Sequence, residues 1–199
     1  MHGLDCSGLV QLALHAFAEK SQCTVSVALG WCGELYKYDP YRTTRIKGVT
    51  LCMPSKEAAA EAVMIANAIF SVRDQVNTPA NLYGPDELER DARALAKAHS
   101  ARISVISGAA LAKGFPLIQA VGVASPRKPR LIDITWGQAK HPKVTLVGKG
   151  VVFDTGGLDI KPSASMLLMK KDMGGAANVL ALAQMVMDAK LTLLSLIHI

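Results

Sequence analysis

Two lysines and two aspartates lie among paired glycines in one short stretch of the chain. In chain order they are Lys149, Asp154, Lys161 and Asp172, with glycine pairs at residues 156–157 and 174–175. Glycine lets a backbone turn tightly and approach a ligand closely, and carboxylates are the oxygen donors that hard divalent cations prefer. Two such ions can activate a water molecule and bind a carbonyl oxygen. The pattern therefore predicts an active-site loop.

A lysine beside a metal ion has two roles open to it. It can stay cationic and stabilise a developing oxyanion, or it can lose its proton and bind the metal through nitrogen. Bringing a lysine from a pKa near ~10.4 to neutrality at pH 7 costs roughly 4 to 5 kcal/mol, so a neutral lysine requires a neighbouring metal. The residue types leave both roles open for Lys149 and Lys161.

The same stretch carries a family resemblance. It resembles the leucyl (cytosol) aminopeptidase family at Gly148-Lys149-Gly150, Phe153-Asp154-Thr155-Gly156-Gly157, Ile160-Lys161-Pro162 and residues 169–177, with matching spacing. Residues 71–81, 117–122 and 129–134 are similar to the first part of the family's catalytic domain, and residues 30–31 and 35–41 to the end of its amino-terminal domain. The resemblance covers roughly residues 25–190.

The resemblance implies a two-metal exopeptidase that removes leucine-like amino-terminal residues from peptides through a metal-activated water. Lys149 and Asp172 would bind one metal, and Asp154 would bridge both. Lys161 would stabilise the tetrahedral intermediate, and Met169 would help to line the pocket for the first side chain of the substrate. The implied cofactors are two divalent ions, Mn or Zn with Mg as an alternative, and the implied assembly is a homohexamer.

Charge counting predicts that this metal site is incomplete. The resemblance places a further aspartate, a glutamate and an arginine downstream, but Asp188 is the only acidic residue after Asp172. Two divalent ions and Lys161 bring five positive charges, whereas Asp154 and Asp172 return two negative ones. We therefore expect at most one weakly bound ion and no turnover from the 199 residues alone.

The hydrophobic pattern predicts the elements that would position these residues. Ser55 can cap a helix over residues 56–76, and Gly84-Pro85 starts a second helix that ends near Ser100. Apolar runs predict strands at residues 102–106, 117–123, 130–135 and 144–147, and a helix follows Asp172 at residues 174–190. This alternation indicates an α/β fold in which a mixed sheet is flanked by helices. Ligands bind at the carboxyl ends of strands in such folds, which is where Lys149 and Asp154 fall.

The resemblance also divides the chain after residue 54. Residues 1–54 would be the remnant of a smaller α/β amino-terminal domain, and residues 55–199 the first half of a catalytic domain. From Leu191 onward the sequence no longer follows the family, so we expect a truncated or artificial terminus. His198 is then not expected to be a metal ligand.

Composition sets the broad class of the protein. The chain has 50% hydrophobic residues, a mean hydropathy of +0.25 and no apolar run of about 18 residues, so we expect a cytoplasmic protein with a buried core and no membrane span. The net charge of +6 comes from dispersed basic residues, a pattern that does not indicate nucleic-acid binding. Reduced thiols are expected at all four cysteines, which are Cys6, Cys23, Cys32 and Cys52.

Other functions match smaller parts of the sequence. Residues 2–11 resemble the nucleophile segment of NlpC-type cysteine peptidases, which would make Cys6 a nucleophile, but the sequence changes character before a partner histidine is reached. We favour a buried thiol, or foreign sequence over residues 1–24. A non-catalytic binding or assembly chain would keep the fold and lack turnover. A phosphate cradle is disfavoured because Gly148-Lys149-Gly150 lacks the Walker spacing and the carboxylates would repel phosphate.

Overall fold

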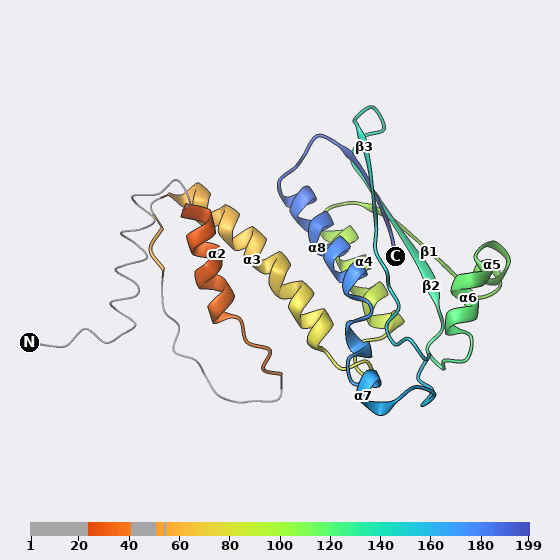
Figure 1. Ribbon diagram of the computed structural model, residues 1–199. Helices are drawn as coiled ribbons and strands as arrows, with labels where there is room; N and C mark the ends of the chain where they lie inside the picture. Colours follow the sequence, from red (N-terminus) through yellow and green to blue (C-terminus); the bar gives the residue numbers. More distant parts are fainter. Residues whose placement is uncertain (1–23, 41–50, 54) are drawn as a thin grey trace, which may run out of the picture. The chain divides into compact units, whose positions relative to one another are not determined.

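The computed structural model describes residues 24–40, 51–53 and 55–199. The chain forms two compact units, Met1–Phe70 and Ser71–Ile199. Figure 1 follows the chain from the first unit, in red and orange, to the second, in green and blue. The predicted domain boundary after residue 54 stays a prediction, and the predictions for Cys6 and the foreign stretch fall outside the described residues.

The first unit contains α2 (Thr24–Leu35) and most of α3 (Lys56–Asn77). The helix predicted over residues 56–76 is confirmed. Ser55 begins this helix, because the Ala58 N–H donates a hydrogen bond to Ser55 Oγ at 3.0 Å.

The second unit is built on a mixed four-stranded sheet. Its strands are β1 (Arg102–Ser107), β2 (Arg130–Trp136), β3 (Lys143–Val147) and β4 (Leu194–His198), in the spatial order β1-β2-β4-β3. Strand β2 is antiparallel to β1 and to β4, whereas β3 and β4 are parallel. The strands predicted at residues 102–106, 130–135 and 144–147 are confirmed, and so is the α/β class with a mixed sheet.

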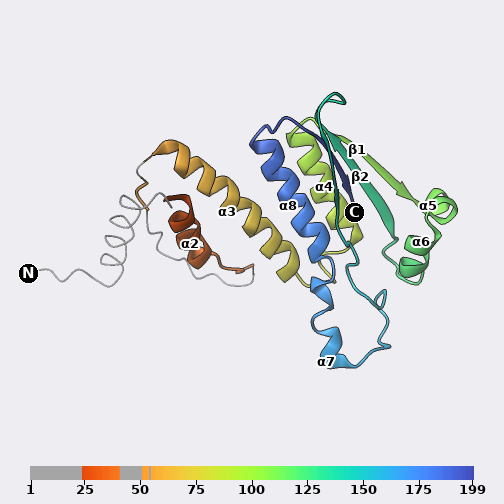
Figure 2. The ribbon, with the colours of Figure 1, turned by 45° about the horizontal axis from the view of Figure 1, so that its top comes forward.

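Two helices cover one face of this sheet. α4 (Pro85–Ala98) and α8 (Gly174–Asp188) lie side by side against it in both views (Figures 1 and 2), and both match predicted helices. The buried core combines isoleucines of the sheet with alanines of the helices, namely Ile132, Ile134 and Ile197 with Ala92, Ala96, Ala176 and Ala183. Small side chains let the helices pack closely on the sheet, so the core is dense without aromatic residues at these positions.

The ends of α4 follow ordinary helix-capping chemistry. The Gly84 N–H donates to Glu87 Oε2 at 2.7 Å, and Pro85 occupies the first helical turn, where its missing N–H costs little. At the other end Ser100 has a φ of 54°, in the left-handed region that stops a helix.

Ion pairs join α4 to the start of β2. Arg130 hydrogen-bonds to Glu89 and places its Nη2 2.6 Å from Asp86 Oδ1, while Arg127 Nη1 lies 3.0 Å from Glu87 Oε2. Burial opposes ionisation of Glu89, but hydrogen bonds from Arg130 and a second arginine hold the pKa of this carboxyl below its usual value. We call the ion pairs of Arg127 and Arg130 with Asp86, Glu87 and Glu89 the arginine clasp.

The strand predicted at residues 117–123 is wrong. Residues 117–122 lie in helix α6 (Pro116–Gly122), which follows the short helix α5 (Gly108–Gly114), and Val123 follows the helix. A short, mostly apolar run gives a weak periodicity for separating a strand from a helix, and Pro116 is well suited to a first helical turn. Leu117 is 81% exposed, unlike a residue of a central strand.

Across residues 24–40, 51–53 and 55–199, no helix has both the length and the apolar character that crossing a bilayer requires.

Candidate functional site

The candidate residues lie in the connection between β3 and α8. Lys149 and Asp154 follow β3, and Lys161 precedes the short helix α7 (Ser163–Met166). Asp172 follows the 3₁₀ turn η1 (Met169–Lys171) and lies just before α8. Because β4 follows α8 and is parallel to β3, the whole set belongs to one β-α-β unit.

Lys149 is fixed by backbone contacts to two other elements. The Gly148 N–H donates to His198 O at 3.0 Å, and the Ala176 N–H donates to Lys149 O at 2.9 Å. A Cβ on Gly148 would lie 2.7 Å from Ala176 Cα, and a Cβ on Gly175 would lie 2.8 Å from Lys149 N. These glycines therefore let the end of β3 touch the first turn of α8. We call residues 147–150 and 172–177 the anchored stretch.

The glycine pair at residues 156–157 acts differently. Gly156 and Gly157 have φ values of 63° and 92°, in the left-handed region that glycine adopts without strain. The turn is closed by hydrogen bonds from the Gly156 N–H to Phe153 O at 2.9 Å and from the Leu158 N–H to Thr155 O at 3.2 Å. It leads into residues 157–168, which we call the exposed loop because most of its side chains are exposed.

The four charged side chains meet in two lysine–aspartate pairs. Lys149 Nζ lies 3.5 Å from Asp172 Oδ1, and Lys161 Nζ donates a hydrogen bond to Asp154 Oδ2. The side chains of Lys161 and Asp154 are each 44% exposed. The structure thus brings together all four residues that the sequence singled out, and their chemical roles stay predictions.

The lysines control the ionisation of Asp154. The hydrogen bond from Lys161 holds the pKa of the Asp154 carboxyl below its usual value, and the charges of Lys161 and Lys149 act in the same direction. Lys149 therefore acts electrostatically on both aspartates and links the two pairs. Asp154 is ionised at neutral pH, as a metal ligand must be.

The side chains present do not fit two divalent ions. Within the described part of the chain, no group of three or more histidine, cysteine, aspartate or glutamate side chains is placed to hold a metal ion. Asp154 and Asp172 are each engaged by a lysine. The buried Thr155 Oγ1 has no hydrogen-bond partner among the described residues, so a single unused polar atom lies next in sequence to Asp154.

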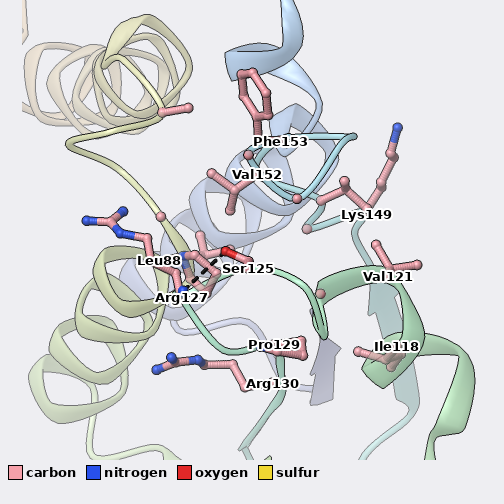
Figure 3. Close-up of a pocket in the computed structure, with 18 of the residues that line it drawn as sticks. Leu88, Ile118, Val121, Ser125, Arg127, Pro129, Arg130, Lys149, Val152 and Phe153 are labelled. Atoms are coloured by element: carbon pink, nitrogen blue, oxygen red, sulfur yellow. Dashed lines mark hydrogen bonds between the residues drawn. The ribbon is translucent and has the colours of Figure 1, made fainter. Parts of the chain in front are cut away.

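A cavity of about 940 Å³ opens beside Lys149. Its lining comes mainly from α6, residues 124–132 and the residues after β3, and it includes Leu88, Ile118, Val121, Val152 and Phe153. In Figure 3 the Lys149 ammonium extends away from these apolar side chains, and the Arg130 guanidinium turns toward α4. The cavity can therefore accept an apolar group near the charged pairs.

Sequence reasoning missed this cavity because it assigned residues 117–123 to a strand. A usable signal was present, since Leu117 and Val121 are four residues apart and follow a proline, a spacing that places both on one helix face.

Two other residues considered from the sequence lie outside the charged pairs. Met169 is 6% exposed and does not line the cavity, whereas Met166 does. His198 lines the cavity from β4, with its Nδ1 3.7 Å from Asp133 Oδ1 on β2. The pocket role predicted for Met169 stays a prediction. So does the expectation that His198 is not a metal ligand.

Comparison with known proteins identifies relatives of this chain. A family model described as the cytosol aminopeptidase family, catalytic domain, matches residues 70–198. The chain is similar to the probable cytosol aminopeptidase of Brucella ovis, with 38% identity over 172 residues, covering 78% of this chain and 34% of the relative. The chain thus spans about a third of the length of the curated relatives it matches.

Solved structures show the same likeness. The cytosol aminopeptidase from Coxiella burnetii is 41% identical with a TM-score of 0.79, and the match covers 87% of this chain and 38% of that one. The bottromycin maturation enzyme BotP, solved in complex with Mn, is 38% identical with a TM-score of 0.77, over 88% of this chain and 38% of that one. The fold described above therefore corresponds to part of these larger structures.

Proposed function

The chain belongs to the cytosol aminopeptidase family, and from this premise we propose that it carries part of the machinery of a metal-dependent aminopeptidase releasing leucine-like amino-terminal residues from peptides. The observation that carries the proposal is the meeting of two lysines and two aspartates beyond the carboxyl end of β3. This is the edge of an α/β sheet where ligands usually bind.

The proposed roles follow the two pairs. Lys149, Asp154 and Asp172 would be metal ligands, and Lys161 would be the cation that stabilises a developing oxyanion. Divalent ions would supply an activated water and polarise the carbonyl of the substrate. The chain itself keeps Asp154 ionised and holds Lys149 and the residues beside Asp172 in place through the anchored stretch. The Mn complex of BotP supports manganese as a candidate metal.

We expect the 199 residues alone to have no turnover, because two carboxylates cannot neutralise two divalent ions and a lysine. The same observation favours a second candidate function. A non-catalytic binding or assembly chain would keep this fold while both aspartates stay paired with lysines.

A chimera separates these two functions. In it, residues 71–198 replace the corresponding part of the Coxiella burnetii cytosol aminopeptidase, which supplies the remaining length. We expect the chimera to hydrolyse leucine p-nitroanilide with Mn²⁺, and Lys161→Ala to abolish this hydrolysis. The matched control Lys171→Ala changes an exposed lysine of η1 and should retain it. A chimera that folds and assembles like its parent without turnover would favour the non-catalytic function.

Family membership also supports proposals about partners and location. Peptide substrates follow from the family description, and the predicted homohexamer stays a proposal that mass photometry of the protein can test. The relatives' name, cytosol aminopeptidase, supports a cytoplasmic location, which fluorescence microscopy of the tagged protein can test.

A further inference from the structure

The Lys161–Asp154 pair is produced by the backbone between its members. The positive φ values of Gly156 and Gly157 reverse the chain directly after Asp154. The exposed loop then brings Lys161, seven residues further along, back to the same carboxylate. The Lys161 ammonium therefore donates its hydrogen bond to one oxygen of this carboxylate, Asp154 Oδ2.

The charges of the four side chains cancel within the chain. Asp154 is paired with Lys161 and influenced by Lys149, and Asp172 is paired with Lys149. An ammonium that donates a hydrogen bond to a carboxylate neutralises its charge and repels a second cation that approaches the same group. The aspartates thus satisfy their charge without metal.

We propose that Lys161 is an internal counter-ion for Asp154, so that a divalent cation must compete with the Lys161 ammonium for this carboxylate. This inference rests on the proposed function, in which Asp154 is a metal ligand. The exposure of the pair supports displacement, because both side chains are 44% exposed and the Lys161 ammonium can move into water.

Lys149 differs from Lys161 in this respect. Its Nζ lies 3.5 Å from Asp172 Oδ1, at the outer limit of a hydrogen bond, and its backbone is fixed by α8. Lys161 is carried by the exposed loop, where most side chains are exposed. The two lysines are therefore held differently, Lys149 by its backbone and Lys161 by the exposed loop.

The test measures Mn²⁺ binding to the 199-residue chain at low salt. The electron paramagnetic resonance signal of free Mn²⁺ reports how much of the ion remains unbound. We expect Lys161→Met to bind Mn²⁺ about three- to tenfold more tightly than the unchanged chain, a modest gain because exposed ion pairs are weak. Lys161→Arg keeps the charge and should bind like the unchanged chain. The matched control Lys171→Met removes one nearby exposed lysine charge and should change affinity less than about twofold. Far-UV circular dichroism checks that each variant is folded.

A double variant shows whether the gain acts through Asp154. Adding Asp154→Asn to Lys161→Met should remove the gain. The proposal is overturned if Lys161→Met binds no more tightly than Lys171→Met, if the gain survives without Asp154, or if no variant binds Mn²⁺. This readout is independent of turnover, so the chimera can fail while the counter-ion role stands, and the reverse also holds.

Discussion

The two lysine–aspartate pairs are held in place in different ways. Lys149 and Asp172 belong to the anchored stretch, where backbone groups of β3, β4 and α8 bond directly and Met173 is fully buried. Asp154 and Lys161 meet through a glycine turn and the exposed loop. One contiguous family signature thus combines a part whose geometry is set by the core with a part whose geometry is set by a local turn and an exposed ion pair. Perturbing the two parts separately should give very different results.

The largest difference is expected for truncated side chains. Met173→Ala removes a fully buried side chain beside Asp172 and should lower the free energy of unfolding by about 2–5 kcal/mol. Leu167→Ala in the exposed loop, where Leu167 is 77% exposed, should change it by less than about 0.5 kcal/mol. Urea denaturation followed by Trp136 fluorescence, in a Trp31→Phe background, measures both. Equal losses would show that the two parts are held alike.

The glycine contact in the anchored stretch should be the next most sensitive point. Gly148→Ala places a Cβ 2.7 Å from the backbone of α8, so we expect a loss of about 1–3 kcal/mol in the same assay. Gly114→Ala, at the end of α5, meets no atom within 4 Å and serves as the matched control with little change. A Gly148→Ala variant as stable as the control would mean that α8 can shift away from β3.

Gly157→Ala tests the turn of the exposed loop. No atom lies within 4 Å of the new Cβ, so only the φ of 92° opposes the change, and we expect a loss of about 1 kcal/mol. A loss as large as that of Gly148→Ala would indicate that this turn, too, is built into the core.

The smallest effect is expected for the change in stability at acid pH that comes from Glu89 in the arginine clasp. Hydrogen bonds from Arg130 and Arg93 hold the pKa of Glu89 below its usual value of 4.5, so the stabilisation from the ionised Glu89 is complete above that pH and is lost as the pH falls through the lowered folded value. Urea denaturation between pH 7 and pH 3 should show this loss, and Arg130→Met should flatten the acid side of the curve. An unchanged curve in Arg130→Met would exclude Glu89 as its cause.

Elements with a strong local signal could be predicted from the sequence. Ser55, Gly84 and Ser100 mark helix ends by chemistry that acts within one turn, and the confirmed strands are short apolar runs bounded by polar residues or proline. The apolar content of residues 117–123 alone predicts a strand, although Pro116 and the four-residue spacing of Leu117 and Val121 favour a helix.

The candidate site was only partly predictable. Spacing and family resemblance singled out the four charged residues, but the partner of each lysine depends on where the chain returns after the turn at residues 156–157. The place of β4 between β2 and β3 likewise depends on long-range pairing that no local pattern encodes. The apolar cavity depends on both, because its walls come from segments far apart in sequence.

The parallel pairing of β3 with β4 has a consequence for the order of folding. All four charged residues lie on the connection between these strands, and the Gly148 N–H bonds to the last residue of β4. Closing a long connection to form a parallel pair is slow compared with forming the helices. The Lys149–Asp172 pair should therefore appear late, and pulse-labelled hydrogen exchange should show the Gly148 amide gaining protection after the amides of α4. Folding intermediates would then contain helices while Lys149 and Asp172 are still apart.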